Sequence, residues 1–142
     1  MYTKVIPATG EIELEQKVNS FIIGKNVVDI KFTEWISYQN QTGGYTAYIL
    51  YEAGTPTRQI QVKIFGVTGD ADLERQVNLF IANKQVVDIK YTEWVEFEAE
   101  TGGYSALVMY LVDQNSQSQI QQPGQNNRLR SKSRSGPQFN VL

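Results

Sequence analysis

The chain has 142 residues and a formal net charge of −2, which fits one ordinary soluble domain. It contains no cysteine and no histidine, so it lacks disulfides, thiolate nucleophiles, zinc–thiolate sites and the histidine of the usual hydrolase triads. No apolar run approaches the roughly 18 residues of a membrane span, and the N-terminus lacks the apolar stretch of a signal peptide. We therefore expect a cytoplasmic protein that contacts no membrane, is not an enzyme, and uses no cofactor or metal.

One segment occurs twice in the chain. Residues 27–35 read VVDIKFTEW, and residues 86–94 read VVDIKYTEW, an offset of 59 positions. The match extends without a gap on both sides of this segment. Two copies are too few for a solenoid, and each copy alone is of marginal size for a stable domain. The sequence therefore predicts two copies that share one core.

The domain organisation follows from this repeat. We predict a single pseudo-twofold domain over residues 1–112, with repeats at 2–52 and 61–111. Residues 113–142 are rich in Gln, Ser and Asn, a composition typical of a disordered tail. The body carries 9 basic and 14 acidic side chains, whereas the tail carries four basic side chains and one acidic. The result is an acidic body with a basic tail.

Each copy predicts a strand, a helix and two further strands. The first strands are expected at residues 3–6 and 59–65, and the third strands at 45–51 and 104–111. Both helices show apolar residues at helical spacing: Leu14, Val18, Phe21 and Ile22, then Leu73, Val77, Phe80 and Ile81. Asp70 is expected to cap the second helix, and Gly24 to end the first.

The long second strand alternates between apolar and polar residues. The side chains expected to face the core are Val28, Ile30, Phe32, Ile36 and Tyr38, then Val87, Ile89, Tyr91, Val95 and Phe97. Those expected on the opposite face are Asp29, Lys31, Thr33, Trp35 and Ser37, then Asp88, Lys90, Thr92, Trp94 and Glu96. The predicted fold class is α+β, with a six-stranded, mainly antiparallel sheet and two helices on one side.

The repeated pattern resembles a known family. It reads Asp72-Leu73-Glu74, Val77-Asn78, Phe80-Ile81, Val87-Asp88-Ile89-Lys90-Tyr91, Tyr104-Ser105-Ala106 and Tyr110. It is similar to a family of small bacterial proteins first noted in Bacillus sporulation, which carry these positions once per chain. The resemblance implies that this chain is a tandem duplication of that domain.

In size and expected elements the chain also resembles the phage Thoeris anti-defence sponges of the first type. Those proteins are oligomers that sequester a cyclic isomer of ADP-ribose and so deprive a host immune effector of its signal. This resemblance implies a phage-encoded protein in the host cytoplasm. It carries over no ligand-contacting residue.

The two tryptophans are the clearest candidates for binding. Trp35 and Trp94 lie on the strand face opposite the predicted core, which also carries Lys31 and Lys90. An indole face near a cation suits a nucleobase and its phosphate. A subunit interface, or the face where one copy packs on the other, would use the same residues.

Other polar features have a structural alternative. Glu34 and Glu93 fall on the apolar face, where a carboxylate needs a partner, so a structural hydrogen bond is expected rather than catalysis. The tail contains a basic run that suits phosphate, although a simply solvated tail is the more common case. Nucleic acid is not expected as a partner, because the body of the chain is acidic.

Two functions from different classes fit these observations. The first is a non-catalytic sponge that sequesters a phosphate-bearing cyclic nucleotide. Its predicted ligand contacts are Trp35, Trp94, Lys31, Lys90, Arg58, Arg128 and Arg130. The second is a ligand-free structural or interaction module related to the sporulation proteins. In either case we expect a homo-oligomer, because the outward tryptophans and the apolar third strands leave more apolar surface than a small monomer exposes.

Overall fold

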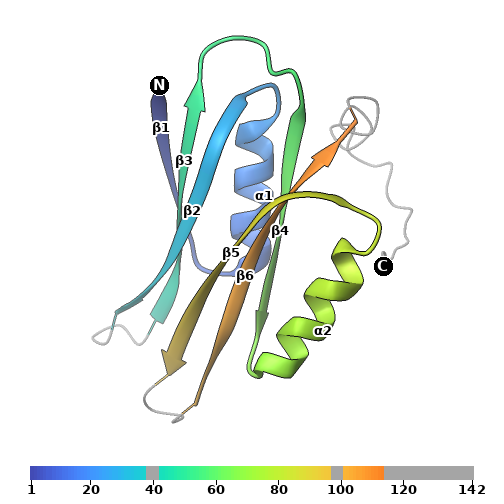
Figure 1. The fold of residues 1–142 in the computed structure, drawn as a ribbon. Helices are drawn as coiled ribbons and strands as arrows, with labels where there is room; N and C mark the ends of the chain where they lie inside the picture. Colours follow the sequence, from blue (N-terminus) through green and yellow to red (C-terminus); the bar gives the residue numbers. More distant parts are fainter. Residues whose placement is uncertain (38–41, 97–100, 114–142) are drawn as a thin grey trace, which may run out of the picture. The chain divides into compact units, whose positions relative to one another are not determined.

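The structure is a computed structural model that describes residues 1–37, 42–96 and 101–113, with side chains omitted at 36, 37, 96 and 101. Both copies have the predicted order of strand, helix, strand and strand (Figure 1). The elements are β1 (Tyr2–Ala8), α1 (Glu11–Ile22), β2 (Asn26–Ser37), β3 (Thr42–Glu52), β4 (Gln59–Val67), α2 (Asp70–Ile81), β5 (Gln85–Glu96) and β6 (Thr101–Val112). The first of the two compact units, residues 1–111, contains nearly all of them.

The six strands form two sheets of three strands each. Sheet A has the strand order β1-β3-β2, and sheet B has the order β4-β6-β5. The α+β class, the repeated units and the antiparallel pairing are confirmed. The single six-stranded sheet is wrong, because the edge strands β2 and β5 meet through side chains and not through a backbone ladder. The placement of both helices on one side is also wrong, because α1 and α2 pack toward opposite faces of sheet B.

The helices bury the predicted apolar stripes. Leu14, Val18 and Ile22 are buried on α1, and Leu73 and Val77 are buried on α2. Gly24, expected at the end of α1, adopts a positive φ of 73°, which glycine tolerates without a steric penalty.

Asp70 does not cap α2 as predicted. Gly69 is the N-cap residue, and Asp70 is the first residue of the helix. The Asp70 carboxylate accepts a hydrogen bond from the backbone N–H of Ala71 at 2.7 Å. Its side chain still lies in the first turn, where an acidic group interacts favourably with the helix dipole.

Two apolar cores lie on opposite faces of sheet B. The first core joins α1 and the helix side of sheet A to Ile60, Val62 and Ile64 of β4 and to Leu107 and Met109 of β6. The second core joins α2 to the other face of sheet B, through residues that include Val67, Ala106 and Val108. Strand β6 is therefore buried on both faces.

The two copies consequently meet through different faces. Copy one contributes its helix side, whereas copy two contributes the face of sheet B that points away from α2. A twofold axis would bring the same face of each copy together. The predicted pseudo-twofold relation does not describe this contact, which is heterologous. The face of sheet A away from α1, here called the outer face, has no counterpart packed on it within residues 1–111.

Three of the residues predicted to face the core on the second strand of each copy do not do so. Val28 is exposed, because a β-bulge between Val27 and Asp29 turns Val27 to the core instead. Tyr91 and Val95 are exposed on the α2 side of sheet B. Ile30 and Phe32 are buried as predicted, and Ile89 is partly buried. Tyr38 and Phe97 lie outside the described residues.

No helix in the described part of the chain is long and apolar enough to cross a membrane.

Candidate functional site

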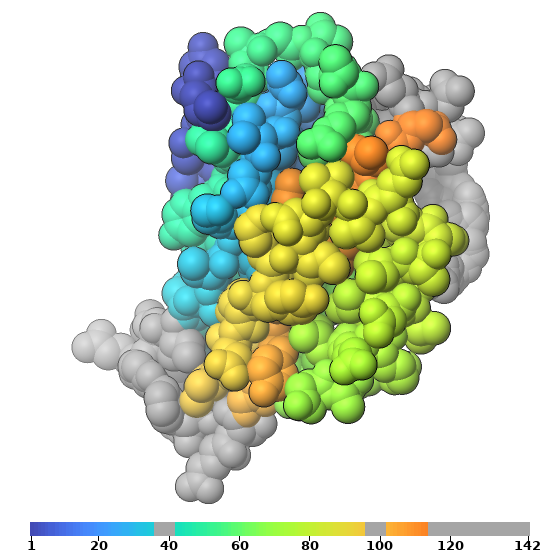
Figure 2. Space-filling view, viewed as in Figure 1, coloured from blue at the N-terminus to red at the C-terminus, as the bar shows by residue number. Residues whose placement is uncertain are grey.

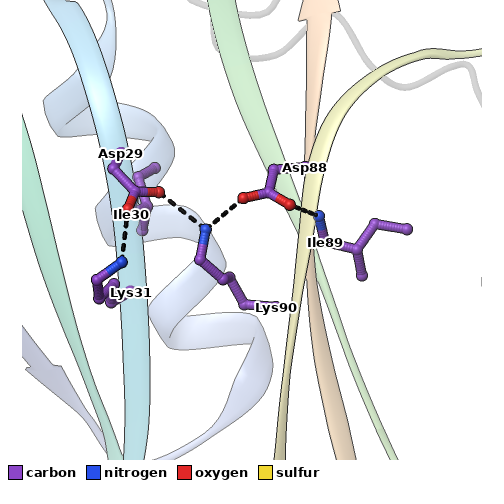
Figure 3. Close-up of polar contacts among 6 residues, drawn as sticks. All are labelled: Asp29, Ile30, Lys31, Asp88, Ile89 and Lys90. Atoms are coloured by element: carbon purple, nitrogen blue, oxygen red, sulfur yellow. Dashed lines mark hydrogen bonds and ion pairs between the residues drawn. The ribbon is translucent and has the colours of Figure 1, made fainter.

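Charged side chains connect the two copies where β2 and β5 run beside each other. The Lys90 ammonium donates to Asp29 at 2.8 Å and to Asp88 at 2.5 Å, so one cation bridges carboxylates from both copies (Figure 3). Lys31 donates to the other Asp29 oxygen at 2.7 Å. We call these four residues the charged seam.

Contacts within the charged seam shift the pKa values of Asp29, Asp88 and Lys90. Partial burial opposes the charged form of Asp29, but hydrogen bonds from Lys31 and Lys90 outweigh it and lower the pKa of Asp29 to about 2. Burial likewise opposes the ammonium of Lys90, yet its two carboxylate partners raise its pKa. Asp29, Asp88 and Lys90 are therefore charged near neutral pH. Both predicted phosphate-binding lysines already have anionic partners.

Glu34 lies near the charged seam on the helix side of sheet A. Its carboxyl accepts a hydrogen bond from the Thr92 hydroxyl of the other copy at 3.4 Å. Burial raises the pKa of Glu34 to about 7; the Thr92 bond opposes this rise and the charge of Glu11 adds to it. The contact has the structural character expected of this carboxylate. Its counterpart Glu93 is exposed.

A buried hydroxyl pair also joins the copies. The Tyr45 hydroxyl of β3 and the Ser105 hydroxyl of β6 lie 2.9 Å apart, and Tyr45 also donates to Glu11 at 3.0 Å. Burial is the largest cause of the raised pKa of Tyr45. The pair therefore remains neutral and acts as a hydrogen-bonded contact within the first core.

Side chains of helix α1 provide hydrogen-bond partners for the backbone of β4 along the edge that pairs with no described strand. The Asn19 side chain bonds both backbone groups of Val62, accepting from its N–H at 2.8 Å and donating to its carbonyl at 3.0 Å. The Glu15 carboxylate accepts from the N–H of Ile64 at 2.9 Å and lies 3.8 Å from the Lys63 ammonium. Because β4 is an edge strand, these bonds cover backbone groups that would otherwise face solvent.

The tryptophans occupy two different environments. Trp35 lies on the outer face of sheet A, opposite Gly44, and is partly exposed. Trp94 lies on the face of sheet B that meets copy one, and its buried Nε1 has no hydrogen-bond partner among the described residues. A Cβ at Gly44 would come within 2.7 Å of the Trp35 ring, and Gly103 is equally constrained by Trp94. Each glycine therefore makes room for an indole.

The structure does not gather the predicted ligand contacts into one site. Trp35 and Lys31 share the outer face of sheet A, whereas Trp94 and Lys90 face the other copy. Arg58 is exposed between β3 and β4. Arg128 and Arg130 lie outside the described residues. Within the described ranges, no group of three acidic side chains is arranged to hold a metal ion.

Sequence reasoning missed the α1–β4 edge contact and the Tyr45–Ser105 pair. A signal was present for the first. Glu15 and Asn19 recur as Glu74 and Asn78 on the polar side of both helices, although surface positions of a helix are usually free to vary.

These features define a class of protein: two tandem β-α-β-β units whose copies pack through a heterologous face and a charged seam. Comparison with known families narrows the class for the second copy. Residues 59–112 match the family described as sporulation protein Cse60. This match confirms the predicted resemblance to the small sporulation proteins. Neither the curated proteins nor the solved structures contain a match to the chain.

Proposed function

We propose that the chain is a non-catalytic interaction module that assembles with further copies of itself in the cytoplasm. The observation that carries the proposal is the outer face of sheet A, which exposes Val5 and Tyr48 side by side in register. The counterparts of these residues in sheet B, Ile64 and Leu107, are buried against copy one. A face of this composition is typical of a protein interface.

The charged seam argues against ligand capture by its two lysines. Lys31 and Lys90 are bound to Asp29 and Asp88, so a phosphate would have to displace a carboxylate to reach them. The family description of residues 59–112 names no ligand and no reaction.

A second candidate function is sequestration of a phosphate-bearing cyclic nucleotide. Trp35 favours it, because this side chain is partly exposed on the same face as Lys31 and Thr33. Isothermal calorimetry with a panel of cyclic nucleotides and cyclic ADP-ribose isomers tests it. Binding that is lost in Trp35→Ala would support sequestration, and no heat with any member of the panel would refute it.

Sedimentation equilibrium of the full chain tests the assembly proposal. Tyr48→Glu places a charge on the outer face, where the exposed side chain leaves the fold intact. We expect this variant to sediment as a single 16.1 kDa chain at concentrations where the unaltered protein is larger. The matched control is Ile12→Glu, which alters a well-exposed apolar residue on α1 away from the outer face. An unaltered protein that stays at 16.1 kDa at every concentration would refute the proposal.

A further inference from the structure

The contact between the two copies provides a template for a contact between two chains. Within the chain, the polar side of α1 binds the edge of β4 through Asn19 and Glu15. By the offset of 59 residues, the counterparts of these two side chains are Asn78 and Glu74 of α2. Both are exposed to solvent.

The receiving strand also has an unoccupied counterpart. The backbone groups bound by α1 belong to Val62 and Ile64, which correspond to Thr3 and Val5 of β1. Among the described strands, β1 lies at the edge of sheet A and pairs only with β3. An exposed strand edge offers unpaired N–H and C=O groups to a partner. Among the described residues, one half of the template is therefore without a partner on α2, and the other half is without a partner at Thr3 and Val5 of β1.

Burial differs between the copies as this template requires. Val5 and Tyr48 are 51% and 42% exposed, whereas their counterparts Ile64 and Leu107 are 5% and 0% exposed. The mismatch reverses on the helix side. Phe32 is 6% exposed because copy two covers it, and its counterpart Tyr91 is 61% exposed beside α2. Each copy thus exposes a face whose equivalent in the other copy is buried.

The two free surfaces lie on different sides of the molecule. Within residues 1–111, the dark blue surface of β1 and the yellow-green surface of α2 appear on opposite sides of Figure 2. An open groove follows β1, lined by Lys4, Val5 and Pro7 of the strand and by Lys17 and Phe21 of α1. Lys4 corresponds to Lys63, the cation that lies near Glu15 in the internal contact.

We infer that α2 of one chain docks on the edge of β1 and the outer face of sheet A of a second copy, with Asn78 bonding Thr3 and Glu74 bonding Val5. This inference rests on the proposed function and specifies its geometry. The contact repeats the internal one, so chains join head to tail in the order sheet A, α1, sheet B, α2, then sheet A of the next chain. A repeated heterologous contact ends as a closed ring when its rotation closes, and otherwise continues as a filament.

A mixing experiment with full-length variants tests this geometry. Val5→Asp blocks the strand side, and the double variant Glu74→Ala with Asn78→Ala blocks the helix side. All three residues are exposed, so each variant should keep the melting curve of the unaltered chain at dilute concentration. Each variant alone should associate at least about tenfold more weakly. Val5→Asp places a carboxylate against Glu74 of the second copy, and the double variant lacks the side chains that bond the strand edge.

An equimolar mixture of the two variants should form a pair of twice the 16.1 kDa chain mass and grow no further, because each variant retains one working surface. The control is Arg75→Ala, an exposed α2 residue whose counterpart Gln16 makes no hydrogen bond to β4 among the described contacts. If the unaltered protein assembles and both variants assemble equally well, the inference is overturned while the proposed function stands. Variants that each lose assembly but fail to pair in the mixture would also overturn it. A monomeric unaltered protein would refute the proposed function itself.

Discussion

At the scale of single residues, Glu34 shows how the contact between the copies changes side-chain chemistry. Its counterpart Glu93 has the same neighbours in sequence but is exposed, whereas Glu34 is partly buried beside Thr92. The sequence predicted that this carboxylate falls on an apolar face and needs a partner. It could not predict that the partner comes from the other copy, because that pairing depends on how the copies pack.

Glu34 should make stability depend on pH. Its pKa rises from 4.5 to about 7 in the folded chain, so folding favours the protonated form. This contribution is fully present below about pH 4.5 and is lost as the pH rises through about 7. Allowing for solvent screening of a partly exposed group, the loss is about 1 kcal/mol.

Urea unfolding of the unaltered chain and of Glu34→Gln between pH 4.5 and 8 measures this effect. The difference in free energy of unfolding should shift in favour of the variant by about 1 kcal/mol as the pH rises. Glu93→Gln is the matched control, because it makes the same change at the exposed counterpart of Glu34. Parallel pH profiles for the unaltered chain and Glu34→Gln would contradict the burial of this carboxyl.

At the scale of elements, the local pattern of the sequence determined most of the fold. Helical spacing placed both apolar stripes, and period-two alternation placed both long strands. The bulges between Val27 and Asp29 and between Val86 and Asp88 were not predictable, because a bulge leaves no periodic signal. In copy one the predicted core face is therefore wrong next to the bulge, at Val28, whereas in copy two the exposed Tyr91 and Val95 lie further along β5.

The helix stripe gives a direct test of the second core. Val77→Asp places a charge between α2 and sheet B, where burial of an unpaired carboxylate should cost at least about 3 kcal/mol. Leu79→Asp on the same helix is the control, because Leu79 is well exposed and should change stability by less than about 0.5 kcal/mol. Thermal melting monitored by circular dichroism distinguishes the two. Equal melting temperatures would mean that α2 packs through another side.

The two asparagines of the helices form a matched pair for the edge contact. Asn19→Ala removes two hydrogen bonds to Val62 and should lower the free energy of unfolding by about 1–3 kcal/mol. Asn78→Ala makes the same change at an exposed position and should be near neutral in dilute, single-chain solution. Urea unfolding at low protein concentration gives both values. A similar cost for both variants would argue against the α1–β4 contact.

At the scale of the whole molecule, the sequence predicted two copies and a shared core but not how the copies meet. The third strands are apolar on both faces in both copies, so alternation alone cannot show which copy is covered on both sides. The structure shows that β6 is buried on both faces, whereas β3 leaves Tyr48 exposed. The pseudo-twofold prediction fails for the same reason, since symmetry between the copies cannot be read from local pattern.

This asymmetry also explains why the predicted ligand contacts are separated. Trp35 and Trp94 are equivalent in sequence, yet one lies on a free face and the other lies against copy one. Among the described residues, the two tryptophans therefore do not lie in equivalent environments that could form two equal sites. In a head-to-tail assembly, the outer face of sheet A would be covered by the next chain. Its equivalent face on sheet B is covered in the same way by copy one within the chain.

Native mass spectrometry of the purified full-length protein tests the central claim most directly, because one spectrum reports both the number of chains and any small molecule bound to them. We predict species at whole multiples of the 16.1 kDa chain mass, with no additional mass from a bound nucleotide. A single 16.1 kDa species at all concentrations would contradict assembly. A species that carries the extra mass of a cyclic nucleotide would contradict a ligand-free module and favour sequestration.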